Sequence, residues 1–277
     1  MIFTEIIAFM LIGAFTGVAA GLLGIGGGLI IVPLSLIVFE LMAKNGGIQI
    51  PFEYQAHVAI ATSLATIIFT SLSAIYSQQK KGAINWSIFW LLTPGILIGA
   101  FSGAWLASFI PRTALLLFFA SFVTLVGFKM WSGWSPHTKG QLPGRPGMSF
   151  VALFIGAISA IVGIGGGTMT VPFLNWGKIT IQNAVAVSSA LGLPIAISGT
   201  LGFFWSSLHL GLGDSAALNL MWGYIYLPAF FAIISVSMIT ARLGVYLSHS
   251  LSKQMLSRVF SILLIVLAIK LYYSVLL

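Results

Sequence analysis

The chain contains no cysteine and very few charged residues. Without cysteine, disulfide bonds, thiol catalysis and cysteine metal sites are excluded. Only 6% of the 277 residues are Asp, Glu, Lys or Arg, whereas an average soluble domain contains about 25%. A water-soluble globular fold is therefore excluded as well.

Acidic residues are the scarcest charged group. The four carboxylates are Glu5, Glu40, Glu53 and Asp214, and each lies near the end of an apolar segment. Because no two carboxylates share the middle of a segment, the usual intramembrane proton relay is absent. The sequence also has no metal-ligand cluster, no nucleophile with its acid and base, and no cofactor loop. We therefore expect no enzyme, no cofactor and no metal.

Apolar residues dominate what is present. They make up 59% of the chain, in recurring runs of about 20 residues, the length of a membrane-spanning helix. The runs do not alternate as β-barrel strands do. The fold class predicted is an all-α polytopic membrane protein. The N-terminus carries Glu5 and no basic region, so we do not expect a cleaved signal peptide.

A glycine run occurs twice inside apolar sequence. The first copy spans 24–28 and leads to Pro33; the second spans 163–167 and leads to Pro172, 139 positions later. Glycine costs backbone order and adds nothing to a core, so the repetition needs a physical reason. We expect two transmembrane repeats, 1–131 and 149–277, joined by a cytoplasmic linker at 132–148 that is rich in proline and glycine.

The basic residues give the net charge of +8, but they are scattered, so they indicate membrane orientation and not a nucleic-acid surface. If each glycine-bearing block crosses once, Lys and Arg divide six against six between the two sides. If each block folds back at its glycines, they divide nine against three, which follows the positive-inside rule. We therefore predict two hairpins with limbs of 12–18 residues and six full crossings, arranged as inverted repeats.

This arrangement predicts a multi-pass membrane protein with the linker cytoplasmic and both termini outside. Whether the hairpins are re-entrant or span the bilayer is left open. We expect the chain to be surrounded by lipid and to bind a small anion. The oligomeric state is left open, and a homodimer is one option.

The amides that open the helix after each glycine run can form an anion site without a charged side chain. They carry the positive end of the helix dipole, and backbone amides inside a membrane need a cavity or a ligand. The alternative is a hinge or a close packing contact with no ligand. A dinucleotide fold and a P-loop are rejected because the spacing fits neither motif.

Hydroxyl side chains could complete this site. Thr62, Thr66 and Thr70 share one helix face, and the pair Thr62-Ser63 matches Ser188-Ser189 in the second repeat. The alternative role of such hydroxyls is helix packing. The predicted substrate-binding residues are Gly24, Gly26, Gly27, Gly28, Thr62, Ser63, Gly163, Gly165, Gly166, Gly167, Thr168, Ser188 and Ser189.

Two further features, a histidine at a helix start and two glycine faces, each have a functional and a structural interpretation. His57 and its counterpart Asn183 begin equivalent helices, where a gating or proton-carrying role competes with a structural one. Glycines at 13, 17 and 21, and at 95, 99 and 103, form GxxxGxxxG faces. For these faces we predict close helix packing.

Residues 21–33, 59–64 and 160–172 carry a resemblance. The doubled GxGGG pattern followed by Val-Pro, with Thr62-Ser63 between the copies, resembles the TauE/SafE family of sulfite and organosulfonate exporters over about 8–275. Ala61 stands where that family has a glycine. The resemblance implies a bacterial or archaeal inner-membrane permease for small sulfur-containing or related organic anions.

We therefore expect a secondary transporter that exports a small anion, such as sulfite or an organosulfonate, by alternating access around the two glycine runs. The alternatives are a proton-coupled permease that uses His57, an anion channel, and a non-transporting assembly subunit of the membrane.

Overall fold

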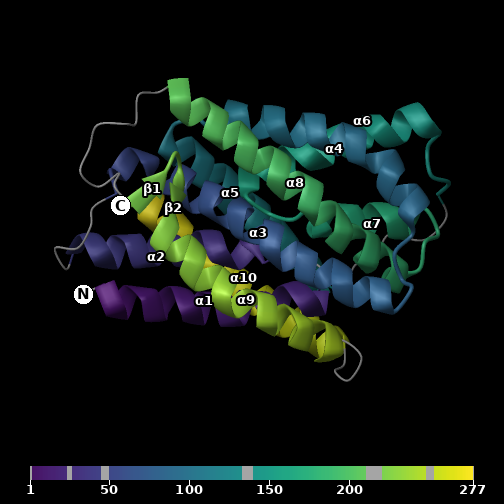
Figure 1. Cartoon of the computed structure of the whole chain (residues 1–277), viewed down its shortest axis with the longest axis horizontal. Helices are drawn as coiled ribbons and strands as arrows, with labels where there is room; N and C mark the ends of the chain where they lie inside the picture. The colour runs from purple at the N-terminus through teal and green to yellow at the C-terminus, as the bar shows by residue number, and fades with distance from the viewer. Residues whose placement is uncertain are drawn as a thin grey trace.

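The structure is a computed structural model, and it describes residues 2–23, 27–44, 50–132, 140–209, 220–247 and 253–276. These residues form helices almost throughout, which confirms the all-α class (Figure 1). Among them, eight helices are long and apolar enough to cross a membrane.

The elements of the first half are α1 (Ile2–Leu23), α2 (Gly28–Lys44), the 3-10 helix η1 (Phe52–Tyr54), α3 (Gln55–Lys80), α4 (Trp86–Ala107) and α5 (Arg112–Ser132). Those of the second half are α6 (Arg145–Val162), α7 (Gly167–Trp176), α8 (Ile181–His209), β1 (Met221–Trp222), β2 (Ile225–Tyr226), α9 (Leu227–Leu247) and α10 (Lys253–Leu276). Helix α6 begins inside the range 132–148 expected for the linker, because Pro146 is tolerated in the first turn of a helix.

The lengths of the hairpin limbs differ from the prediction at two of four positions. Helices α2 and α6 have 17 and 18 residues and fall within 12–18. Helix α1 has 22 residues and α7 has 10. At 1.5 Å per residue α1 is about 33 Å long, enough to span the hydrocarbon core by itself. By length and composition alone, α1 and α6 could also cross a membrane, in addition to the six crossings predicted.

The apolar run over 221–241 is not helical from its start. Residues 221–226 form a two-stranded antiparallel hairpin in which Met221 pairs with Tyr226, and its turn contains Gly223 at φ 59°. Helix α9 starts only at Leu227. Pro228 lies in its first turn, where its missing amide costs no helical hydrogen bond.

Figure 1 shows the starts of α1 and α3 and the end of α10 at one end of the bundle, called here the terminal end. The end of α3 and the start of α6 lie at the opposite end, called here the linker end. Helix α2 returns beside α1, so the first hairpin enters from the terminal end. The second hairpin, α6 with α7, enters from the linker end.

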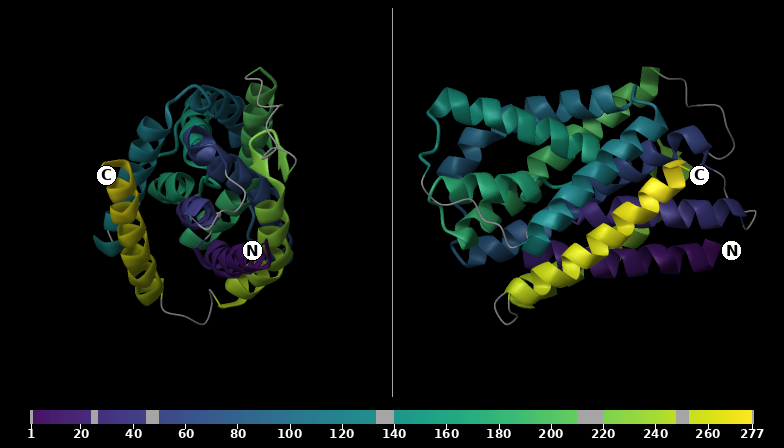
Figure 2. Two further views of the ribbon diagram at one scale, coloured as in Figure 1. Left: turned by 90° about the vertical axis from the view of Figure 1, so that its left-hand side faces the viewer. Right: turned by 180° about the vertical axis from the view of Figure 1, so that it is seen from behind.

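Helices α3 and α8 contact each other at the centre of the bundle. In the apolar stretch of each candidate span, 78% of the residues of α3 and 72% of those of α8 are buried inside the protein. The share is half or less in the other six spans. Helix α1 packs on α9 and α6 packs on α4, while α10 lies against α5 on the outside (Figure 2).

Glycines allow the closest of these helix contacts, as predicted for both GxxxGxxxG faces. A Cβ on Gly17 would lie 2.6 Å from the carbonyl oxygen of Ser237 in α9, and one on Gly103 would lie 2.5 Å from that of Ala157 in α6. Real Cβ atoms do not approach so closely, so both helix pairs require glycine.

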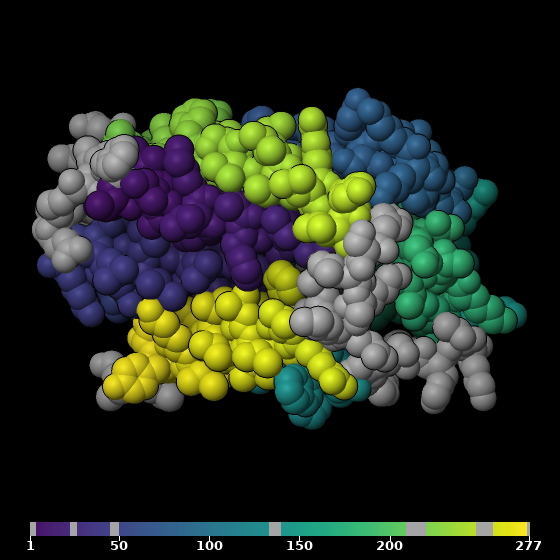
Figure 3. Space-filling model, turned by 90° about the horizontal axis from the view of Figure 1, so that it is seen from below, coloured from purple at the N-terminus to yellow at the C-terminus, as the bar shows by residue number. Residues whose placement is uncertain are grey.

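Large apolar side chains cover the outside of the bundle. Leu11, Leu125 and Ile239 are each about two-thirds exposed, and α1, α9 and α10 all face outward on one side (Figure 3). Exposed apolar surface of this extent is unfavourable in water and matches a lipid environment.

Candidate functional site

The second glycine run forms a turn between α6 and α7. Gly163 ends α6 with φ 75° and Gly166 precedes α7 with φ 76°, both in the left-handed region that favours glycine. The amides of Met169 and Thr170 donate to the carbonyl oxygen of Gly166. Among the described residues, the four amides before them, at 165–168, have no acceptor. Consecutive free amides around a left-handed residue form a concavity that suits an anion.

The first glycine run repeats this geometry where it is described. Gly24 and Gly26, both predicted site residues, lie outside the described residues together with Ile25. Gly27 has φ 72°, and its carbonyl oxygen accepts hydrogen bonds from the amides of Ile30 and Ile31 at 3.0 and 3.1 Å. The prediction that a helix starts directly after each run is confirmed in both copies.

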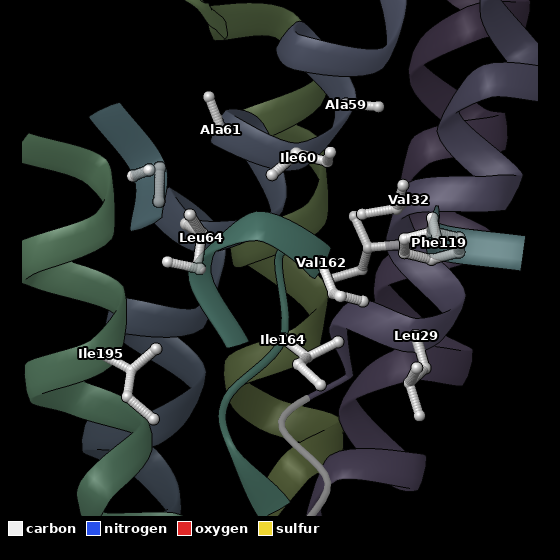
Figure 4. Packing of buried hydrophobic residues seen from close by; sticks show 14 of the residues in the cluster. Leu29, Val32, Ala59, Ile60, Ala61, Leu64, Phe119, Val162, Ile164 and Ile195 are labelled. Carbon is white, nitrogen blue, oxygen red and sulfur yellow. The ribbon is translucent and has the colours of Figure 1, made fainter. Parts of the chain in front are cut away.

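The two glycine turns touch each other inside the bundle. A side chain on Gly28 would overlap with the carbonyl group of Gly163. Ser63 of α3 donates a hydrogen bond of 2.8 Å to the same carbonyl oxygen. Figure 4 shows the surroundings: Val162 and Ile164 lie between Leu29 and Val32 on one side and Leu64 on the other.

The paired hydroxyls have four different surroundings. Thr62 Oγ1 accepts a hydrogen bond of 3.0 Å from the amide of Tyr226, and so holds β2 onto α3. Ser63 binds the second turn, and Ser189 donates to the carbonyl oxygen of Val185 in its own helix. Ser188 is fully buried, and its hydroxyl has no partner among the described residues.

The rest of the predicted hydroxyl stripe on α3 serves the backbone. Thr66 donates to the carbonyl oxygen of Ser63, Thr70 to those of Thr66 and Ile67, and Ser73 to that of Met238 in α9. These bonds fit helix packing, which was the alternative interpretation of the stripe.

A small, mostly apolar hollow adjoins the second turn, with room for about one water molecule. Its lining residues are Ala20, Thr70, Ser71, Ala74, Gly165, Ser189 and Gly192. They come from both repeats, and the residues of α3 belong to its half nearer the linker end. Gly165 and Ser189 are two of the predicted site residues, so the hollow joins them in one place.

Aromatic side chains fill the opposite side, toward the terminal end. His57 is buried and stacks on Tyr224 of the β hairpin with ring centres 5.6 Å apart. Tyr226 packs against Phe9 and Phe39 with ring centres about 6 Å apart. Burial, with a smaller contribution from Glu5, raises the pKa of Tyr226 to about 12, so its phenol is neutral at physiological pH.

The two candidate gating residues differ in position. The Nε2 atom of His57 donates to the carbonyl oxygen of Ile110 over 3.1 Å, and Nδ1 is buried without a partner among the described residues. Asn183 is exposed at the start of α8, where its amide donates to Thr180 Oγ1 over 3.4 Å. The structure therefore brings His57 into the core and leaves its counterpart outside it.

Two residues near the second turn escaped the sequence prediction. Ser159 and Thr170 are fully buried, and their hydroxyls have no partner among the described residues. Each hydroxyl oxygen lies 3.6 Å from the place that a Cβ on Gly166 would occupy. The spacing of 139 residues aligns them with Ala20 and Ile31, so a comparison of the repeats position by position would have found them.

Comparisons with known proteins find relatives over nearly the whole chain. The family described as "Sulfite exporter TauE/SafE" matches residues 9–271. A probable membrane transporter protein of Haemophilus influenzae is 32% identical over 271 residues, which cover 98% of this chain and 99% of the relative. One from Xylella fastidiosa strain 9a5c is 30% identical over 93% of this chain and 91% of its own length. One from Methanocaldococcus jannaschii is 24% identical over 88% and 86%. No solved structure matches significantly.

Proposed function

Because the chain belongs to the sulfite exporter TauE/SafE family of membrane transporters, we propose that it exports a small anion, such as sulfite or an organosulfonate, as a secondary transporter. The anion binds at the glycine turns, and the two repeats give access to it alternately from each side. The relatives compared above are named as transporters and not as enzymes, in keeping with a chain that moves its substrate unchanged.

The observation that carries this proposal is the row of amides at 165–168, which have no acceptor in the described part of this membrane protein. Amides without a partner are costly in lipid, and here they adjoin a hollow lined by both repeats. Amides and hydroxyls donate hydrogen bonds and present no negative charge. Such a set of donors favours an anion and disfavours a cation.

The arrangement of the hairpins supports alternating access. Two helix hairpins enter from opposite ends and touch through their glycine turns (Figure 1). Inverted repeats whose broken helices meet near the midplane are the plan of many secondary transporters. The hollow lies toward the linker end, while aromatic residues fill the terminal end. We propose that this conformation faces the cytoplasm.

The membrane potential can drive the export by itself. With the inside negative, moving one negative charge outward gains about 2.3 kcal/mol per 100 mV. No coupled ion is then required, which fits a chain whose few carboxylates lie near segment ends.

The direct test is flux through the purified chain in proteoliposomes, with sulfite, sulfate, thiosulfate, sulfoacetate and taurine as the panel. We expect saturable transport of anions and poor transport of zwitterionic taurine. The variant Gly166→Val should abolish flux, because it forces a branched side chain into a left-handed turn covered by Ile195. Gly82→Val is the matched control: Gly82 has φ 62° but nothing within 4 Å, so its flux should persist.

Three outcomes would contradict the proposal. Undiminished sulfite flux in Gly166→Val would remove the glycine turn from the site. Flux that neither saturates nor shows counterflow would indicate a channel. A folded chain that moves none of the anions would indicate a non-transporting assembly subunit.

A second mechanism is favoured by one observation, the buried Nδ1 atom of His57 that has no partner among the described residues. A proton-coupled permease needs a side chain that can take up and release a proton, as histidine can. This mechanism keeps the same anion site and differs only in the driving force.

A further inference from the structure

The two glycine turns share a backbone but differ in the side chains around it. In both copies the left-handed glycine accepts from the amides three and four residues later. The 139-residue spacing aligns Ser159, Thr168 and Thr170 of the second turn with Ala20, Leu29 and Ile31 of the first. The second turn therefore has three hydroxyls at positions where the first turn has hydrocarbon side chains.

These three hydroxyls lie together at one turn. Among the described residues five other buried hydroxyls also lack a partner, and they are spread over α2, α8, α9 and the β hairpin: Ser35, Ser188, Thr200, Tyr224 and Ser237. Buried hydroxyls on its other helices mostly donate to a carbonyl oxygen of their own helix, as Thr16 does to Ile12 and Thr93 to Phe89, both over 2.7 Å. The hydroxyls at 159, 168 and 170 are buried and have no partner in the part of the chain that the structure describes. Buried polar groups almost always find a partner, so three exceptions at one turn indicate that a ligand supplies it.

The donors converge around Gly166. The oxygen atoms of Ser159 and Thr170 lie on the same side of this residue, each 3.6 Å from the place of its absent Cβ. The four amides at 165–168, which find no acceptor within the described ranges, belong to the same turn. Together they form a set of neutral donors that reach a ligand from more than one direction.

We propose that the second turn alone holds the anion, and that Ser159 and Thr170 select an oxyanion with acceptor oxygens on several sides. This inference rests on the proposed function and assigns its binding site to one repeat. The first turn, with Leu29 and Ile31 only 2% and 1% exposed, then acts as an apolar packing partner that bears on the second turn through Gly28.

The side chain of Ile195 of α8 limits the space beside Gly166 at this site. Its Cδ1 atom lies where a side chain on Gly166 would begin. Because Cδ1 is the far end of a side chain, a change of rotamer can move it. The space that it yields suits a small oxyanion such as sulfite better than a long organic tail.

The test is binding of sodium sulfite to the purified full-length chain by calorimetry under nitrogen. We expect Ser159→Ala and Thr170→Val each to weaken binding by roughly 10-fold or more, as for hydrogen bonds to charged groups. Thr170→Ser keeps the hydroxyl and should restore most of the affinity.

Thr16→Val is the matched control at the first turn. The Cβ atom of Thr16 lies 3.5 Å from the Cβ position of Gly27, and its hydroxyl already donates to the carbonyl oxygen of Ile12. Its affinity should stay within about twofold.

Chloride competition gives a second readout. Amides bind halides and oxyanions alike, so loss of both hydroxyls should reduce the preference for sulfite over chloride.

Suppose that the double variant Ser159→Ala with Thr170→Val keeps wild-type affinity and preference while Gly166→Val loses binding. The hydroxyls are then not selective and the inference is wrong, although the proposed function stands. If the wild type neither binds nor transports any anion of the panel, the proposed function itself fails. Should Thr170→Val not fold, Ser159→Ala and Thr170→Ser decide the matter.

Discussion

At the scale of single residues, neighbours in the sequence serve different partners. Ser63 reaches across to the second glycine turn, while the adjacent Thr62 holds the β hairpin. The sequence predicted both as site residues because it shows hydroxyls without their partners. It could not show that Thr66 and Thr70 donate to their own helix, since the choice between backbone and ligand depends on the packing around each side chain.

His57 allows the two mechanisms to be separated. Export driven by the membrane potential alone predicts that His57→Gln transports thiosulfate with the same dependence on pH as the wild type, between about pH 5 and 8, where histidine titrates. The amide nitrogen of glutamine can still donate to the carbonyl oxygen of Ile110, so the fold should persist. Flux should be measured in proteoliposomes with a clamped potential.

Thiosulfate is suited to this test because it does not titrate in that range. A wild-type flux that depends on pH, and that loses this dependence in His57→Gln, would replace the uncoupled mechanism with the proton-coupled one. The conservative variant Asn183→Gln, at the exposed counterpart on α8, is the control and should leave the profile unchanged.

At the scale of elements, the sequence predicted most helices well because apolar runs and polar loops alternate along the chain. The prediction from apolar runs failed at 221–226, where a few residues determine a structure that differs from the one the composition favours. The stretch 221–226 is apolar enough for a helix, yet Gly223 in the left-handed region and Pro228 in the first turn of α9 make it a hairpin. Two of the four limbs of the glycine hairpins, α1 and α7, also differ in length from the prediction, because hydropathy does not mark where a helix ends inside an apolar run.

The contact between α1 and α9 gives the prediction at this scale. Gly17→Leu should lower the free energy of unfolding by about 3 kcal/mol, the upper end for overpacked cores, because even its Cβ would lie 2.6 Å from the carbonyl oxygen of Ser237. Leu11→Ala, on a side chain that is 66% exposed on the same helix, should change it by less than about 0.5 kcal/mol.

Unfolding of the purified variants in mixed detergent micelles measures both values. Equal stability of Gly17→Leu and the wild type would mean that α1 and α9 are not in close contact in the membrane. Such a result would contradict the packing role of the glycine face.

At the scale of the whole molecule, the charges follow the course of the helices. Lys80, Arg145 and Lys178 lie at helix ends toward the linker end, whereas Lys44 and Arg112 lie toward the terminal end (Figure 1). The nine-to-three division deduced from the sequence needed only the hairpin course, because charge placement depends on topology and not on packing detail. The orientation that it predicts has the linker end in the cytoplasm.

A chain without cysteine makes this orientation directly testable. In intact cells, a membrane-impermeant maleimide should label Glu53→Cys, an exposed position just before α3, and should not label Gln141→Cys, an exposed position just before α6. Permeabilised cells are the control and should show both labelled. The reverse pattern in intact cells would invert the protein and, with it, the direction in which the present conformation is open.

Because the two glycine turns meet inside the bundle, an anion bound there has crossed part of the membrane potential. An anion that reaches halfway across the bilayer senses about half of the field, or roughly 1.1 kcal/mol per charge at 100 mV. This amounts to about a sevenfold gain in apparent affinity from the negative side. Since the turns carry no charged side chain, the voltage dependence of binding belongs to the cargo. A dianion would therefore feel the membrane potential twice as strongly as a monoanion in the same site.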